Sequence, residues 1–408
     1  MYYEEAFELM ALDENFEIVS LITYANLQWS RKFNDVGTFS VQLRGRQYNS
    51  SWKYVYSKKR KELGIISQIN WNKKNYVETV TLSGKFVESE VNKMIVYPLP
   101  SKFYDDSGTA ADGKEGTCLL RNAGLPTWLG QSGTADIVAR NFFNGFKKIS
   151  WTNYQVDDYS GNSLVTTTRE LDIDFGSIDT GHGPYHYSEH NRNGEYLGDK
   201  LYKILKPSGA SFEVIWDYET HDKTLNIIHG KDLTQENNAG NNPVVFTSAN
   251  GNIISASLVL SNTSTKDTVI QTSEAKDKVY VLVNELPGQE TTGRFVSTRM
   301  QTAVQDYFNN DTVDYATADK NLKLSVMADA DKDLARYTDK QNIEFQIYRG
   351  SYEYMVDYDL GDLISLEISE IGLSLDARII SCYEVVKNGV WELTLEIGTP
   401  LIKNFGEI

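Results

Sequence analysis

Near the C-terminal end the sequence reads Asp357-Tyr358-Asp359-Leu360-Gly361-Asp362-Leu363-Ile364-Ser365-Leu366-Glu367-Ile368. The first half of this stretch carries Asp357, Asp359 and Asp362 together with the turn-forming Gly361. Its second half predicts a β-strand in which Ile364, Leu366 and Ile368 share one face, because side chains alternate along a strand.

Two more strands are predicted after this stretch, at 377–386 and 391–397. They are joined through Asn388-Gly389, a dipeptide that suits the positive φ angles of a tight hairpin turn. Residues 352–408 therefore form a meander with one apolar face, which must be buried against another element.

The N-terminal part, residues 1–103, shows the same pattern of strand, turn and strand. Candidate strands lie at 17–23 and 38–43, and 65–82 predicts a hairpin about Asn72-Lys73-Lys74-Asn75. We expect a small barrel or sandwich, since closure avoids long exposed edges.

Between these ends the chain alternates helix and strand patterns irregularly, which favours an α+β, β-rich class. Residues 104–116 are small and polar and predict a mobile loop. Residues 117–232 predict an α+β domain of helix on small sheet. Its elements are a helix capped by Thr134 and ended by Gly145, a helix at 197–205, and strands at 211–217 and 224–229.

The segment after residue 232 is predicted to contain strands first and then helices. Strands are predicted at 244–246, 253–260 and 278–285, and amphipathic helices at 297–309 and 319–338. The helices make 271–351 an α+β helical segment.

Charge and cysteine content limit the classes of function. The 408 residues carry a net charge of −16, so the chain is a poor candidate for gripping nucleic-acid phosphates, although it could line a path along which DNA moves without sticking. On charge alone, plain solubility is the favoured explanation. Cys118 and Cys382 are far apart and in no metal or redox spacing, which indicates synthesis in a reducing compartment. No apolar run approaches ~18 residues and the N-terminus is acidic, so we expect no membrane anchor and no secretory signal.

Three histidines are the first candidate for a metal site. His182, His186 and His190 are spaced four apart, as on one face of a helix, but Gly183-Pro184 would break that helix. A Tyr- and Gly-rich loop with solvated histidines is the better interpretation.

A second candidate is the triplet Asp179-Thr180-Gly181, which matches the catalytic triplet of aspartic proteases. The only partner triplet, Asp106-Ser107-Gly108, lies in the predicted mobile loop and lacks a strand to hold it. Ordinary turn chemistry explains both triplets. We therefore expect no catalytic, cofactor-binding or metal-binding residues, no cofactor and no enzymatic activity.

At four places the chain resembles the tail hub family of long-tailed bacteriophages, the proteins that close the distal end of the tail tube. The resemblance runs over almost the whole chain and rests on the order of its motifs. They are Asn26–Phe39; Leu63–Ile69 with Ser83-Gly84; Gly230–Leu233 with Asn242–Phe246 and Gly251–Ile253; and Asp357–Asp362 with Ala377–Ile379 and Thr394–Gly398.

The resemblance implies two β-barrel-like domains interleaved with α+β domains. Residues 233–270 would be strands that return to the first barrel, and 352–408 the closing meander of the second. Three copies would form a ring whose barrels dock onto the hexameric tail tube.

The function implied is that of a structural hub or adaptor in the tail of a phage, prophage or phage-derived particle. Its partners would be copies of itself, tail tube and distal tail proteins, and a tip or receptor-binding protein, with DNA passing through the ring without stable binding. The protein would be made in the bacterial cytoplasm and reside at the tail tip or baseplate of the virion. A virion-associated cell-wall hydrolase and a receptor-binding module are the alternatives.

Overall fold

The computed structural model describes residues 7–96, 128–156, 162–178, 185–190, 195–261, 268–275, 278–285, 295–299, 340–347, 352–387, 389–398 and 401–404. The chain divides into two compact units, one of 1–256 with 344–408 and one of 257–343.

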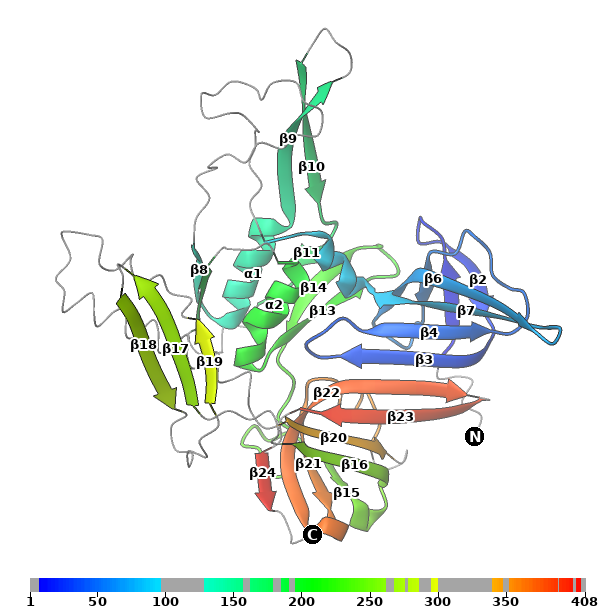
Figure 1. Ribbon diagram of the computed structural model, residues 1–408. Coiled ribbons are helices and arrows are strands. Elements are labelled where there is room, and N and C mark those ends of the chain that lie inside the picture. The colour runs from blue at the N-terminus through cyan, green and yellow to red at the C-terminus, as the bar shows by residue number, and fades with distance from the viewer. Residues whose placement is uncertain are drawn as a thin grey trace. The chain divides into compact units, whose positions relative to one another are not determined.

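The N-terminal part of the larger unit is a β-sandwich. Its antiparallel strands run in the order β3-β4-β7-β6-β5-β1-β2 (Figure 1). Their bounds are β1 (Leu9–Leu12), β2 (Ile18–Ile22), β3 (Tyr24–Lys32), β4 (Thr38–Leu43), β5 (Tyr54–Tyr56), β6 (Leu63–Lys74) and β7 (Val77–Phe86). Trp29, Phe39 and Phe86 form an aromatic cluster in the core. Phe39, Val41 and Leu43 are all buried, which confirms the alternation of apolar and polar side chains predicted for 38–43.

The hairpin of β6 and β7 is confirmed, but its turn lies further along than predicted. Asn75 and Tyr76 occupy the turn with φ angles of 49° and 65°, and Lys74 pairs with Val77. A two-residue hairpin turn needs positive φ at both positions, which Asn tolerates well. Asn72 and Lys73 therefore extend β6 instead of forming the turn.

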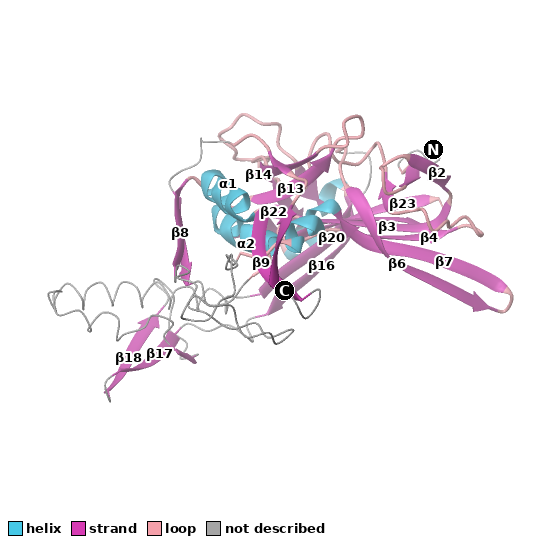
Figure 2. Ribbon diagram, turned by 90° about the horizontal axis from the view of Figure 1, so that it is seen from above, coloured by secondary structure: helices cyan, strands magenta, loops and turns pink. Residues whose placement is uncertain are grey.

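Two helices pack on a small sheet, as predicted for 117–232. They are α1 (Ala135–Phe146) and α2 (Leu197–Leu205), against β11 (Asp174–Phe175), β13 (Ser211–Trp216) and β14 (Lys223–Ile228) (Figure 2). The Thr134 side chain accepts a hydrogen bond from the Ile137 N–H, so the predicted cap is confirmed. Gly145 does not end α1, which continues through Phe146 and is capped in right-handed geometry by Lys147.

Two further strand pairs belong to this region. β8 (Trp128–Gly133) pairs with β12 (Tyr185–His190), and β9 (Lys148–Val156) pairs with β10 (Asn162–Glu170).

The C-terminal part contains β15 (Val245–Thr247), β16 (Ile253–Ser261), β20 (Lys340–Ile347), β21 (Leu363–Ile368), β22 (Leu373–Lys387), β23 (Val390–Ile397) and β24 (Leu401–Asn404). The predicted meander is confirmed: β22 pairs with β21 on one half of its length and with β23 on the other. The second half of β22 also pairs with β3, so one continuous sheet joins the two ends of the chain.

The strands expected to return to the first barrel pair elsewhere. β15 lies parallel to β21, with Phe246 opposite Leu366, and β16 is next to β20. The reason lies in the preceding segment. The Leu233 N–H donates to the Leu363 carbonyl, the Leu363 N–H donates to the Lys231 carbonyl, and the Val244 N–H donates to the Leu233 carbonyl. These bonds hold the chain beside β21 before β15 begins.

The smaller unit contains β17 (Thr268–Ala275), β18 (Lys278–Glu285) and β19 (Phe295–Arg299) in one sheet. The strand predicted at 278–285 is confirmed. The helix predicted at 297–309 is wrong for 297–299, which pair with β17 as part of β19. The rest of that helix, the helix at 319–338 and the loop at 104–116 lie outside the described residues. The α+β, β-rich class itself is confirmed.

Candidate functional site

A buried ion cluster lies where β3, the start of β6 and the loop of residues 352–362 meet. Arg31 is only 4% exposed, because it follows Leu27 and Trp29 on the inward face of β3. Its Nε contacts the Glu62 carboxylate, and its Nη1 lies 2.5 Å from Asp359 Oδ1. A buried guanidinium requires such partners, since an unpaired charge in the interior is very costly.

A second ion pair lies beside it, at the pairing of β22 with β3. Glu384 is fully buried and pairs with Arg60, and the indole Nε1 of Trp391 donates to it at 2.9 Å. Glu62 has the same kinds of partner: it contacts Arg31, and the Trp29 indole Nε1 donates to it at 3.2 Å. Glu62 and Glu384 therefore each have one arginine partner and one tryptophan donor.

Hydrogen bonds hold the loop of residues 352–362 to two other segments of the chain. Asp362 accepts from the Lys231 N–H at 2.6 Å and from the Asp359 N–H at 2.8 Å. The Arg378 guanidinium donates to the carbonyls of His229 and Gly361. The loop thereby bonds to the segment before β15 and to β22, so it joins three distant parts of the chain.

These charges shift the ionisation of the groups around them. Burial raises the pKa of Asp359, but the Arg31 guanidinium outweighs burial and holds that pKa below its ordinary value. Burial also lowers the pKa of Arg31, and Glu62 with the other neighbours raises it well above normal. Both groups stay charged, so the pair functions as an electrostatic clamp.

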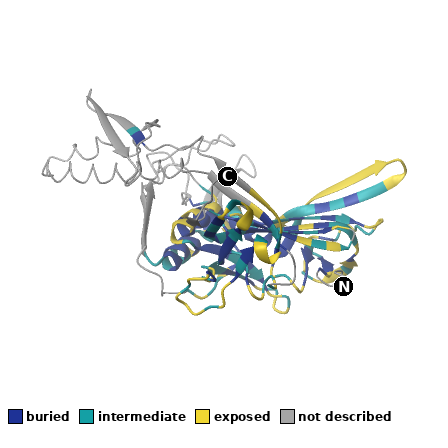
Figure 3. Cartoon of the chain, turned by 90° about the horizontal axis from the view of Figure 1, so that it is seen from below, coloured by how far each residue is buried: buried dark blue, intermediate teal, exposed yellow. Residues whose placement is uncertain are grey.

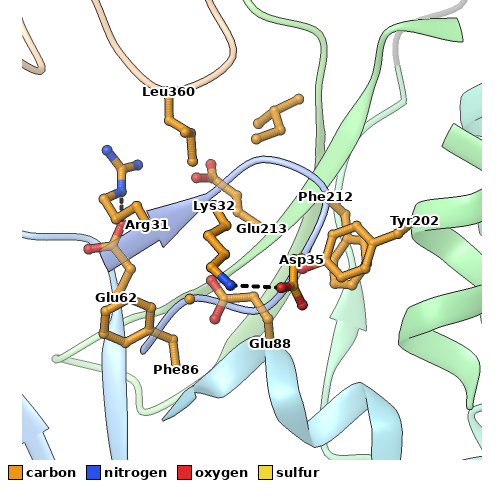
Figure 4. A pocket seen from close by; sticks show the side chains of 12 residues that line it. Arg31, Lys32, Asp35, Glu62, Phe86, Glu88, Tyr202, Phe212, Glu213 and Leu360 are labelled. Carbon is orange, nitrogen blue, oxygen red and sulfur yellow. Dashed lines mark hydrogen bonds and ion pairs between the residues drawn. The ribbon is translucent and has the colours of Figure 1, made fainter. Parts of the chain in front are cut away.

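Next to the clamp is a small cavity of about 20 Å³ (Figure 4). Four acidic side chains line it, namely Asp35, Glu62, Glu88 and Glu213, together with Arg31 and Lys32. Lys32 Nζ lies 2.8 Å from Asp35 Oδ2, as the dashed line in Figure 4 marks.

Glu88 is the least satisfied of these groups. Its Oε2 is buried without a hydrogen-bond partner, and burial raises its pKa to about 8. Burial likewise raises the pKa of Glu213. The cavity has room for about one water molecule and is far too small for a sugar ring. Glu88 can bind a proton there, and in its protonated form it can hydrogen-bond to a water molecule in the cavity.

The residues singled out from the sequence lie elsewhere. His186 and His190 are in β12, where they pair with Ser132 and Trp128 of β8. The loop predicted there is therefore wrong for 185–190, because these residues form a strand. His182, both Asp triplets and Cys118 lie outside the described residues. Cys382 is buried in β22, and burial raises the pKa of its thiol.

Among the described residues, no group of three or more His, Cys, Asp or Glu side chains is placed to hold a metal ion. In the same part of the chain, no helix has the length and apolar character needed to cross a membrane.

The ion cluster was not found from the sequence, although a signal was present. Arg31 interrupts an alternating apolar series on β3, and Glu384 does the same between Cys382 and Val386 on β22. A charged residue at an inward position of a strand indicates a buried ion pair. The sequence around the partners Glu62 and Asp359 contains no comparable sign of burial.

Comparison with solved structures shows a known fold. The tail protein from Neisseria meningitidis MC58 superposes with a TM-score of 0.54 at 11% identity, covering 96% of each chain. The 43 kDa tail protein of prophage MuSo2 from Shewanella oneidensis gives 0.49 at 10% identity, covering 96% of this chain and 98% of that one. A component of the type VI secretion system of E. coli gives 0.40 at 8% identity, covering 95% and 76%.

No curated protein matches the sequence. The family model described as Siphovirus ReqiPepy6 Gp37-like protein matches residues 134–399, which is more than half of the chain. With its β-rich tail-protein fold, the chain belongs to the Siphovirus ReqiPepy6 Gp37-like protein family.

Proposed function

We propose that this protein is a structural hub at the distal end of the tail of a phage, prophage or phage-derived particle, where it joins the tail tube to the baseplate or tip. The family and the tail-protein fold support a structural role in a tail. The adaptor role, the ring and its partners are the finer parts of the proposal.

The observation that carries the proposal is the pairing of β22 with β3. It makes the N-terminal sandwich and the C-terminal strands one sheet, and Arg31 with Asp359 and Arg60 with Glu384 clamp the junction. A chain that holds two sheet-bearing parts in a fixed relation offers two docking faces. Three such chains offer six, which matches the symmetry of a hexameric tube.

The charge of the chain suits a ring through which DNA moves. Each chain carries −16, so three chains repel the phosphate backbone instead of retaining it. In this proposal the partners are further copies of the chain, the tail tube and distal tail proteins, and a tip or receptor-binding protein.

The protein in this proposal is not an enzyme and needs no cofactor. The cavity next to Arg31 has room for about one water, and the ion pairs of Arg31 with Glu62 and Asp359 hold the junction together. Synthesis in the bacterial cytoplasm and incorporation into the virion tail follow from the same proposal.

The test is the mass of the purified protein over a concentration series, by light scattering after size exclusion, with imaging of the largest species. A ring of three copies with a central opening is expected. Species of another symmetry, or a protein that digests purified cell walls and loses that activity on substitution of one carboxylate, would overturn the hub assignment.

A further inference from the structure

The outer half of β6 lacks a second neighbouring strand. β5 pairs only with Leu63–Ile65, and the Ile66 N–H bonds to the Lys53 carbonyl. A β-bulge follows between Ile66 and Gln68. From Gln68 to Lys74 the strand pairs with β7 alone among the described strands, and Figure 3 shows this hairpin standing clear as an exposed arm.

One face of this arm is apolar. Ile69 and Trp71 lie opposite Leu82 and Val80, which belong to the sandwich core, so all four share the core-facing side. Trp71 is nevertheless 61% exposed, because the arm extends past the strands that would cover it. Tyr76 at the tip is 97% exposed. A free edge with an uncovered apolar face is a ready template for strand addition.

A second free edge lies in the same sandwich. β2 is the last strand in the order of the sheet and pairs only with β1 in the described part of the chain. It exposes Ile18, Val19 and Leu21, of which Leu21 is 58% exposed. Solvated apolar side chains on an edge strand again indicate a missing partner.

The two edges are complementary in charge. The arm ends in Lys73, which pairs with Glu78 of β7, and in Lys74, which is exposed, whereas the turn before β2 carries the exposed acids Glu14 and Glu17. Opposite charges beside exposed apolar side chains favour this partner and this position. Two like arms would instead bring their lysines together.

We propose that the free edge of β6 in one copy of this chain adds to the free edge of β2 in the next copy. This inference rests on the proposed function and names the surfaces through which the ring would form. Because the two edges differ, each copy uses both, and a repeated contact of this kind closes into a ring when its rotation allows.

The first experiment compares Trp71→Glu with Asn72→Glu by light scattering over a concentration series. Asn72 is the matched control, since it is the next residue on the same strand and points to the opposite, polar face. Trp71→Glu is expected to weaken self-association about tenfold or more, as removal of a central aromatic contact does. Asn72→Glu is expected to leave association within about threefold, because its side chain lies on the face of the arm opposite to Trp71. Both variants should keep the circular dichroism and melting temperature of the native chain, because both side chains are exposed.

A charge exchange tests the second edge. Lys74→Glu and Glu17→Lys should each weaken association, and the chain that carries both changes should recover it. Recovery assigns the contact to β6 and β2, whereas additive loss in the double variant overturns that assignment.

The outcomes separate this inference from the hub proposal. If the native chain assembles and Trp71→Glu assembles equally well, the strand-addition contact is overturned and the ring stands. If the native chain stays monomeric at every concentration, the strand-addition contact is overturned and the ring loses its support in the isolated protein.

Discussion

Arg31 and Asp359 are 328 positions apart in the sequence, and their Nη1 and Oδ1 atoms lie 2.5 Å apart. Arg31 also holds Glu62, so a single buried guanidinium bonds to β6 and to the loop of residues 352–362 at once. This contact fixes the C-terminal part against the N-terminal sandwich at the place where β22 pairs with β3. Its removal should therefore weaken the junction more than the loss of any exposed ion pair.

Replacement of Arg31 by Met tests that expectation. The change leaves Glu62 buried without its cation, and removal of one partner of a buried pair typically costs about 3–5 kcal/mol. Lys32→Met, on the next residue, breaks an exposed pair with Asp35 and should cost about 1 kcal/mol or less. The free energy of unfolding in urea measures both. Equal losses would show that the Arg31 cluster contributes no more than a surface pair.

Glu88 should make the protein less stable as the pH rises. Its pKa is raised from 4.5 to about 8 in the folded chain, so the unfolded chain releases this proton first as pH rises. The free energy of unfolding therefore falls between about pH 4.5 and 8, by at most about 1.4 kcal/mol per pH unit for one proton. Glu88→Gln removes this dependence and should be more stable than the native chain at pH 8, with the advantage shrinking toward pH 4.5. Chemical unfolding across this range measures it, and parallel profiles for both proteins would contradict the prediction.

Gly361 should not tolerate a side chain. Its φ is +95°, and a Cβ there would lie 2.5 Å from a ring carbon of Phe33. Gly45 is the matched control, because it also has positive φ, at +69°, but a Cβ would meet nothing within 4 Å. Gly45→Ala should cost about 1 kcal/mol from backbone strain alone. Gly361→Ala adds an overlap worth about 1–3 kcal/mol more. Thermal unfolding distinguishes them, and similar losses would mean that Phe33 moves aside freely.

Cys382 should react with thiol reagents only when the junction opens. It lies fully buried on β22, and burial raises the pKa of its thiol, so little reactive thiolate forms. Alkylation followed by mass spectrometry of the Cys382 peptide is expected to be slow in the native chain and faster in Arg31→Met. Rapid labelling of the folded native chain would show that this end of β22 opens without global unfolding.

The local elements of this protein follow from short sequence patterns. Alternation of Phe39 and Val41 predicted β4, the Thr134 cap predicted the start of α1, and Asn388-Gly389 predicted the hairpin in which Lys387 of β22 pairs with Val390 of β23. These features depend on residues a few positions apart, so their physical causes are visible in the chain as written. The alternation of Ile364, Leu366 and Ile368 was likewise enough to predict the buried face of β21.

The pairing of distant strands and the burial of charges depend on tertiary packing. β15 joins β21 because of backbone bonds from Leu233, which no local pattern encodes. Asp359 and Glu62 resemble solvated carboxylates in the sequence, and burial against Arg31 makes them part of a clamp. The raised pKa of Glu88 has the same origin. Desolvation depends on what packs around a group, and here the neighbours come from segments hundreds of residues apart.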